Sequence, residues 1–331
     1  MKSHLFLILT LALDMLGASI FGLNAQEPVP TNRYAMKLEK KADGSYALQR
    51  ENRYAKILNL SEIPDLYTPY VHQNNRLTGK LYSKARTQEY IYKTHEGYEL
   101  CIEVDSFDSD SPTPVMFYIH GGGWARGSYT SSRSLSKYLA QQHGITGVRI
   151  QYTLAPQPGA NVQVSIQDVL DAVAYVRDHA SELNVDINRI GFLGSSAGGH
   201  LAAVAALKCN AKVFVGYSGI YDLTTAAITT RAKDPERINY FGGLKNDYLA
   251  AASPIFMIPK KSKLAAQLYC GTGDLTVECS QSEEFASALK RHKAKADLQE
   301  YKYYDHNLSS KTSDKMEEIF FKTVDFVVEN L

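Results

Sequence analysis

The sequence contains little that would bind a metal or a nucleic acid. Only four of its 331 residues are cysteines, and they form neither a C-x-x-C pair nor a Cys/His spacing that is typical of zinc sites. Lys plus Arg (36) and Asp plus Glu (35) nearly cancel, so the net charge is +1 and no basic surface for nucleic acid is indicated. No repeat or block of like charge occurs. We therefore expect no metal and a partner that is small or neutral.

The apolar run at the N-terminus is too interrupted for a permanent transmembrane helix. Asp14 follows the run at residues 5–13, and a carboxylate at the middle of a bilayer costs about 2.5–3.5 kcal/mol. A charged start before a short apolar stretch is typical of a secretory signal peptide, which we expect to occupy residues 1–25. The segment lacks the cysteine of a bacterial lipoprotein. We expect a secreted or periplasmic protein with no stable membrane span after processing.

The rest of the chain has the composition of an ordinary globular enzyme, with 44% apolar and 21% charged residues. We expect one large domain over residues 87–331, which is long enough for a sizeable core. Residues 26–86 are polar and rich in tyrosine and form an N-terminal extension. The extension either frames the substrate entrance as a cap or packs on the flank of the sheet, and the sequence favours neither.

A glycine-flanked serine marks the centre of the chain. A short apolar run from Ile190 meets Gly194-Ser195-Ser196-Ala197-Gly198, and an Ala/Leu-rich stretch at helical spacing follows. Between a strand and a helix, G-x-S-x-G is typical of a nucleophile elbow, in which a strained central residue holds its hydroxyl clear of the sheet. Ser196 is that residue. Taken alone, the pattern also fits a glycine-rich turn that happens to contain serines.

A second glycine motif lies 76 residues upstream of Ser196. The apolar run at residues 115–119 ends in His120-Gly121-Gly122-Gly123-Trp124. A strand that runs into H-G-G-G is typical of the oxyanion-hole loop of lipases and esterases, because bare backbone N–H groups can approach a developing negative charge. The two motifs agree in order and in context.

With these motifs the chain resembles the α/β-hydrolase superfamily, in particular its esterase branch related to hormone-sensitive lipase and to bacterial acetyl-xylan and feruloyl esterases. Tyr152-Thr153-Leu154-Ala155-Pro156 stands where those enzymes carry Y-R-L-A-P, and Gly198-Gly199-His200-Leu201-Ala202 continues the elbow similarly. The resemblance extends from about Glu89 to the C-terminus. It implies an α/β-hydrolase fold, with a mostly parallel, doubly wound sheet, helices on both faces and the active site at the carboxyl ends of the strands.

The fold also implies where the acid and the base stand, because the triad order is nucleophile, acid, base. An expected strand at residues 266–270 runs into a loop that resembles the family's G-T-x-D-x-x-V, which makes Asp274 the acid. Asp222 follows an earlier strand and is its rival. The next strand, at residues 298–304, is followed by His306, which is the expected base.

The resemblance implies an oxyanion hole formed by the backbone N–H groups of Gly122, Gly123 and Ala197. Trp124, the single tryptophan, is the candidate substrate-binding residue, with a packing anchor as the alternative. No cofactor is expected.

Cys270 and Cys279 are open to a disulfide in an exported chain, although buried free thiols are the interpretation that we favour.

The other histidines and one acidic residue are given structural roles. Asp168, in Ser165-x-x-Asp168, is expected in the capping box of a helix over residues 165–183. The histidines are expected as follows: His95 in an exposed turn of a hairpin over residues 89–105, His120 as a hydrogen-bonding support of its loop, His200 as a packed helix residue and His292 at a basic helix end.

The function implied is that of a serine carboxylesterase that forms an acyl-enzyme on Ser196. Export, a neutral charge and the resemblance favour a short-chain acyl or cinnamoyl ester on plant polysaccharide. An arylformamidase or a peptidase of the same fold is the alternative. A non-catalytic binding protein is less favoured, because all three triad positions are filled in order. The sequence leaves the oligomeric state open.

Overall fold

The computed structural model describes residues 85–225, 235–309 and 315–331, together with the short strands β1 (Met36–Lys40) and β2 (Tyr46–Arg50). The expected signal peptide at residues 1–25 lies outside the described residues, as does most of the extension at 26–86. Strands β1 and β2 pair antiparallel. Within the described part of the chain, no helix is long and apolar enough to cross a membrane.

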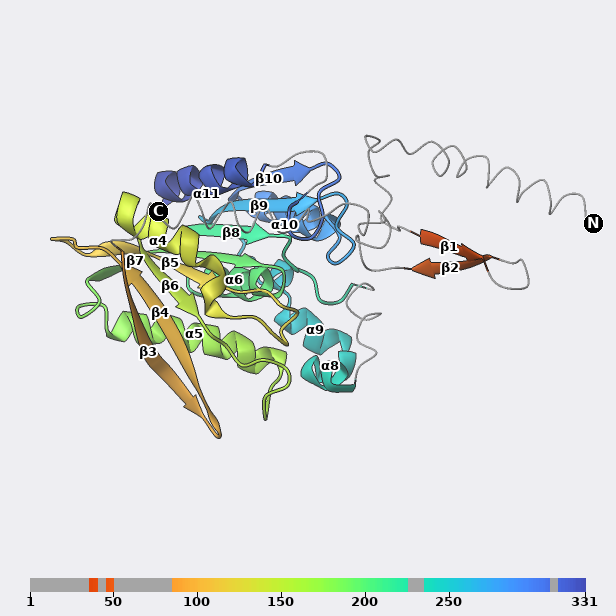
Figure 1. The fold of residues 1–331 in the computed structure, drawn as a ribbon, viewed down its shortest axis with the longest axis horizontal. Helices are drawn as coiled ribbons and strands as arrows, with labels where there is room; N and C mark the ends of the chain where they lie inside the picture. Colours follow the sequence, from red (N-terminus) through yellow and green to blue (C-terminus); the bar gives the residue numbers. More distant parts are fainter. Residues whose placement is uncertain (1–35, 41–45, 51–84, 226–234, 310–314) are drawn as a thin grey trace, which may run out of the picture.

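An eight-stranded sheet forms the centre of the domain (Figure 1), in the order β10-β9-β8-β7-β5-β6-β4-β3. The six strands from β10 to β6 run parallel, and β4 and β3 extend the sheet as an antiparallel hairpin. The bounds are β3 Arg86–His95, β4 Tyr98–Ser106, β5 Thr113–Ile119, β6 Thr146–Ile150, β7 Val185–Ser195, β8 Val213–Tyr217, β9 Ala265–Gly271 and β10 Lys295–Tyr301. This is the mostly parallel, doubly wound sheet that the sequence predicts.

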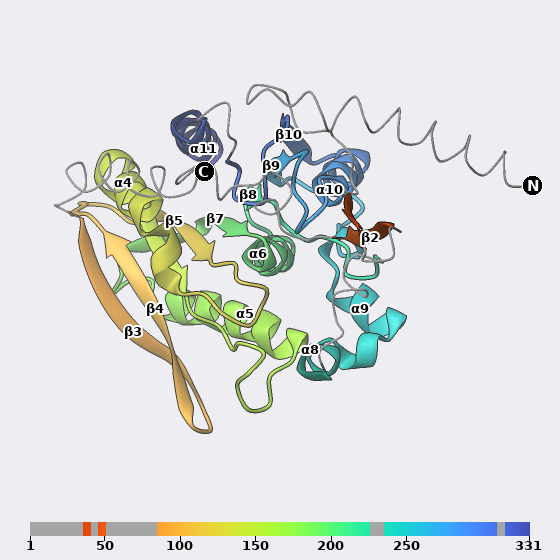
Figure 2. The same ribbon diagram turned by 45° about the vertical axis from the view of Figure 1, so that its right-hand side comes forward.

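Helices cover both faces of the sheet (Figures 1 and 2). Helices α5 (Val162–Asp178), α6 (Ala197–Lys208) and α10 (Ser280–Arg291) pack on one face, and α4 (Arg133–His143) and α11 (Met316–Asn330) pack on the other. The side chains of β5 alternate between the two layers, as the two-residue period of a strand requires. Phe117 and Ile119 join the α5–α6 core, whereas Met116 and Tyr118 join the α4–α11 core.

The described residues of the connection from β8 to β9 form two short helices, α8 (Pro235–Tyr240) and α9 (Asn246–Ala252), and two 3₁₀ turns, η3 (Gly242–Leu244) and η4 (Pro254–Phe256). Both helices lie on the side toward which the arrows of β8 and β9 point (Figure 1). A further 3₁₀ turn, η2 (Tyr129–Ser132), leads into α4. The connection therefore lies at the end of the sheet where parallel α/β folds place their ligands.

The predicted capping box at Ser165 and Asp168 is wrong. Helix α5 begins at Val162, and its N-cap is Asn161, whose side-chain oxygen accepts hydrogen bonds from the backbone N–H groups of residues 163 and 164 at 3.0 Å each. Asp168 is fully buried in the second turn. Its carboxylate accepts hydrogen bonds from the backbone N–H of Thr153 at 2.9 Å and from Lys93 Nζ at 2.8 Å. Asp168 therefore joins α5 to the sheet instead of capping it.

The hairpin is confirmed, but the exposed turn position of His95 is not. His95 is the last residue of β3 and is partly buried. Its Nε2 lies 3.0 Å from the Asp168 carboxylate, and its ring stacks on Tyr98. The buried carboxylate on α5 explains this position, because a buried charge is stable only with hydrogen-bonding partners around it.

Candidate active site

The nucleophile elbow has the backbone that the sequence predicts. Strand β7 ends at Ser195, α6 begins at Ala197, and Ser196 between them has φ 54° and ψ −122°. A side chain on Gly194 would collide with the carbonyl of Gly198, and one on Gly198 would collide with the carbonyl of Ile119. Both glycines are therefore required by close backbone approach. Ser196 is partly exposed and does not cap α6 with its side chain.

The glycine-rich loop after β5 lies directly against the elbow. Because β5 pairs with β7, with Ile119 opposite Gly194, the two motifs leave the sheet at the same edge. A Cβ on Gly121 would lie 3.2 Å from Ser196 Cβ. Gly122 and Gly123 follow with φ values of 115° and 64°, which favour glycine.

These neighbouring backbones bring the loop close to the N-terminus of α6. The first N–H groups of a helix have no partner within the helix and carry a partial positive charge, which favours an anion beside Ala197. The arrangement suits an oxyanion hole with Gly122, Gly123 and Ala197 as donors. Their role as donors remains a prediction.

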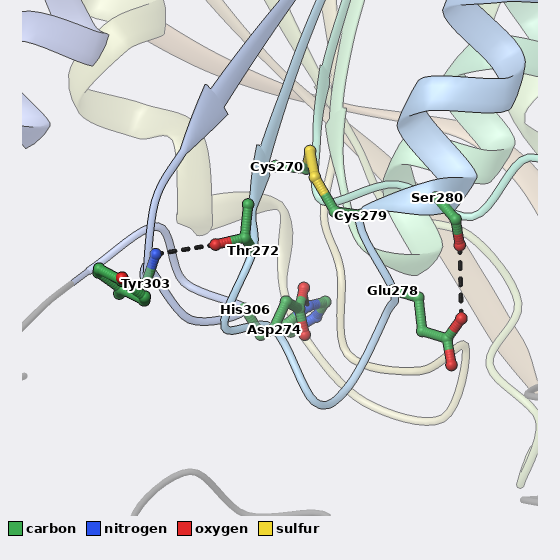
Figure 3. The surroundings of a disulfide bond; sticks show 8 residues. All are labelled: Cys270, Thr272, Asp274, Glu278, Cys279, Ser280, Tyr303 and His306. Atoms are coloured by element: carbon green, nitrogen blue, oxygen red, sulfur yellow. Dashed lines mark hydrogen bonds and ion pairs between the residues drawn. A yellow bond between two sulfur atoms is a disulfide. The ribbon is translucent and has the colours of Figure 1, made fainter. Parts of the chain in front are cut away.

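Asp274 and His306 form a hydrogen-bonded pair, and Figure 3 draws the two side chains close together near the disulfide. His306 Nδ1 lies 2.7 Å from Asp274 Oδ2. The other carboxylate oxygen accepts hydrogen bonds from the backbone N–H groups of Thr276 at 2.6 Å and Val277 at 2.9 Å. Since an ionised carboxylate only accepts, the Nδ1 of His306 carries the proton, and Nε2 keeps the lone pair that a general base needs.

The rival acid, Asp222, has a different environment. Its carboxylate accepts hydrogen bonds from the backbone N–H of Thr224 at 2.8 Å and from the Thr224 hydroxyl at 2.6 Å. These are the bonds of a local turn. Among the described residues, Asp274 is therefore the carboxylate that the fold brings to His306.

The described residues show no hydrogen bond between Ser196 and His306. In enzymes without substrate, the bond between nucleophile and base is often long and tightens only when substrate binds. The structure thus places the acid beside the base. Separately, it places the nucleophile beside the glycine loop.

The two histidines beside the elbow support the backbone. His200 is fully buried, and its Nε2 donates to the carbonyl of Ala252 at 2.8 Å. The indole N–H of Trp124 donates to its Nδ1 at 3.3 Å. His120 Nδ1 lies 2.8 Å from the carbonyl of Gly121, and its ring stacks on Tyr152. The packed role of His200 and the loop-supporting role of His120 are confirmed.

Trp124 is packed deep in the site region. It is 5% exposed, and its ring meets Phe241 edge to face at a centroid distance of 5.1 Å. These contacts are those of a packing anchor, the alternative considered for this residue. Its part in substrate binding stays a prediction.

Cys270 and Cys279 form a disulfide, contrary to the interpretation that we favoured. Buried free thiols are therefore the wrong interpretation, because the fold brings the start of α10 back beside the end of β9. Cys101 and Cys209 are free. The bridged segment carries Asp274 (Figure 3), which sequence reasoning did not connect with the disulfide.

We expect kcat/KM for ester hydrolysis to increase between pH 5 and pH 8, the range in which an ordinary histidine loses its proton. Burial lowers the pKa of His200 to about 4 and also lowers the pKa of His120, so burial disfavours the protonated form of both rings. A base must be unprotonated to accept the serine proton, so activity is lost as pH falls. Initial rates with p-nitrophenyl acetate measure the profile, and a flat profile would exclude His306 as the base.

Comparison with family models matches the chain to BD-FAE over residues 105–289, which is more than half of its 331 residues. The matched region runs from the end of β4 into α10 and contains the elbow, the glycine loop and Asp274.

Among curated proteins, the chain is similar to an arylesterase of Saccharolobus solfataricus, with 30% identity over 148 residues, 43% of this chain and 48% of that protein. It is also similar to an acetyl esterase of Salmonella schwarzengrund, with 35% identity over 101 residues, 29% of this chain and 31% of that protein. The chain therefore spans about half or less of the length of these relatives.

Among solved structures, esterase 2 of Thermogutta terrifontis with butyrate bound superposes with a TM-score of 0.62 and 22% sequence identity. The superposition covers 75% of this chain and 95% of that one. This likeness shows the α/β-hydrolase fold.

Proposed function

Since the chain belongs to the BD-FAE family, we propose that it is a serine carboxylesterase with Ser196, His306 and Asp274 as its triad. The observation that carries the proposal is the His306–Asp274 hydrogen bond at the same edge of the sheet as an elbow whose serine has a positive φ. A glycine-rich turn without catalytic function needs neither this strained serine nor a carboxylate that fixes the tautomer of a histidine.

In the proposed reaction, Ser196 Oγ attacks the ester carbonyl carbon while His306 Nε2 takes the hydroxyl proton. The carbonyl oxygen becomes an oxyanion that accepts hydrogen bonds from the N–H groups of the glycine loop and Ala197. The tetrahedral intermediate collapses, the C–O bond to the alcohol breaks, and His306 gives its proton to the leaving oxygen. Asp274 stabilises the imidazolium during both transfers.

Deacylation repeats these steps with water. His306 takes a proton from a water molecule, whose oxygen attacks the acyl carbon bound to Ser196. Collapse of the second intermediate releases the carboxylic acid and returns the proton to Ser196 Oγ. Over the whole cycle the proton of Ser196 leaves with the alcohol and a proton from water replaces it, and His306 carries both.

For the substrate, we propose a short-chain acyl or cinnamoyl ester on plant polysaccharide. The names of the relatives, acetyl esterase and arylesterase, support small acyl groups and aromatic esters. The connection between β8 and β9 buries Tyr240, Phe241 and Leu249 in the core, although Phe256 is 60% exposed. Apart from Phe256, the described part of that segment therefore offers a long acyl chain little apolar surface.

A panel of esters tests this proposal. The purified protein is assayed with p-nitrophenyl acetate, butyrate and decanoate, and with methyl ferulate and acetylated xylan. We expect acetate and butyrate to be cleaved about tenfold or more faster than decanoate, together with release of acetate from xylan or of ferulate. Fast cleavage of decanoate would contradict the short-chain assignment. Failure of a folded sample to cleave any ester would contradict the esterase, and formanilide or peptide substrates would then test the amidases of this fold.

A further inference from the structure

The disulfide closes the loop that presents Asp274 to His306. Cys270 is the last residue but one of β9 and is 1% exposed, and Cys279 directly precedes α10. Their Cα atoms lie 5.2 Å apart across nine residues of sequence. The bridge therefore ties the two ends of the segment at 271–278 to each other and to two packed elements of the domain (Figure 3).

The first half of this segment is held by the loop that carries His306. The backbone N–H of Thr272 donates to the carbonyl of Tyr301 at 3.0 Å, and that of Gly273 donates to the carbonyl of Tyr304 at 2.9 Å. The Thr272 hydroxyl accepts a hydrogen bond from the backbone N–H of Tyr303 at 2.9 Å. These bonds set the spacing between the acid loop and the base loop.

The second half of the segment orients the carboxylate. One oxygen of Asp274 is held by the backbone N–H groups of Thr276 and Val277, and the other bonds His306. The direction of the carboxylate therefore depends on where residues 276 and 277 lie. They stand three and two residues before Cys279, so the disulfide fixes the half of the loop that sets this direction.

We infer that the Cys270–Cys279 disulfide is a positioning group for the triad: it holds residues 276 and 277 so that the Asp274 carboxylate stays directed at His306 Nδ1. The inference rests on the proposed esterase function. Opening the bridge leaves the bonds to the base loop in place but allows the carboxylate to turn, so the reaction slows while substrate binding changes little.

The first test compares oxidised protein with protein whose bridge is opened by a phosphine reductant, with thiol titration to verify the opening. We expect kcat for p-nitrophenyl acetate to fall about tenfold or more, with KM within about twofold. We expect the Cys270→Ala/Cys279→Ala variant to have the low kcat of the reduced protein and to show no further change when the reductant is added. The matched control, Cys101→Ser/Cys209→Ser, responds as the unmodified protein does. An unchanged kcat after verified reduction overturns the inference.

A double-mutant cycle tests whether the bridge acts through Asp274. In the Asp274→Asn background we expect reduction to change kcat by less than about twofold, because the group that the bridge positions is already lost. A loss as large as that in the unmodified protein would show that the bridge acts elsewhere and would overturn the inference.

Proton NMR tests the same point without catalysis, so failure of the proposed function and failure of this inference are distinguishable. The downfield resonance of the His306 Nδ1–H, assigned by its loss in Asp274→Asn, is expected in the oxidised protein and broadened by exchange with water in the reduced one. The single indole N–H resonance, from Trp124, reports whether the rest of the site stays folded. Loss of both resonances would indicate general stabilisation instead of positioning, and persistence of both would also overturn the inference.

Discussion

Replacement of Ser196 by alanine is expected to lower kcat for ester hydrolysis by about a million-fold, the loss that removal of a triad serine produces elsewhere. The Oγ of Ser196 is the atom that forms the acyl bond in the proposed reaction, and alanine has no nucleophile to replace it. The melting temperature should change little, because Ser196 is partly exposed and its side chain does not cap α6. Alanine at a φ of 54° is no more strained than serine. Initial rates with p-nitrophenyl acetate and a thermal melt measure the two effects.

Ser195 provides the matched control for this variant. It is the neighbouring serine, but it is the last residue of β7 and lacks the positive φ of Ser196. We expect Ser195→Ala to keep activity within a few fold of the unmodified protein. Retained activity in Ser196→Ala, or a greater loss in Ser195→Ala, would move the nucleophile away from the elbow centre.

Replacement of Asp274 by asparagine should lower kcat about ten-thousand-fold. An amide N–H₂ donates where the carboxylate accepts, so it favours the tautomer of His306 with the proton on Nε2. That tautomer cannot take the proton of Ser196. The side chains are nearly equal in size, so we expect the fold to persist. Steady-state rates, with circular dichroism to verify folding, measure the effect.

Asp222→Asn is the control for the acid. The asparagine oxygen can still accept the hydrogen bonds from Thr224, so the turn should survive and activity should stay within a few fold. A larger loss of activity in Asp222→Asn than in Asp274→Asn would show that the acid had been assigned to the wrong strand.

The sequence predicts those parts of the fold that depend on residues close to one another along the chain. The strand, sharp turn and helix around Ser196 follow from glycine spacing and apolar periodicity, and the structure has them. Strand β5 before the glycine loop and the β3–β4 hairpin are predicted for the same reason. In each case the local chain allows few conformations, so the pattern alone is informative.

The errors involve contacts between distant parts of the chain. Asp168 looks like a capping residue within its own helix, but its partner Lys93 is 75 residues away in sequence. His95 looks exposed until that buried carboxylate is placed beside it. The pairing of Cys270 with Cys279 depends on how β9 and α10 meet, which composition does not encode. Local patterns carry no information about these tertiary contacts.

The central claim is that Ser196 is the nucleophile. The most direct test is to treat the protein with an organophosphate ester, which phosphorylates the nucleophile of serine hydrolases, and to identify the residue that is modified. Trypsin should release residues 190–208 as one peptide, since Arg189 precedes it and Lys208 ends it. We predict one phosphoryl group on this peptide, placed on Ser196 by fragmentation, with esterase activity lost in proportion to labelling. Inactivation with the group on another residue, or undiminished labelling of Ser196→Ala, would contradict Ser196 as the nucleophile.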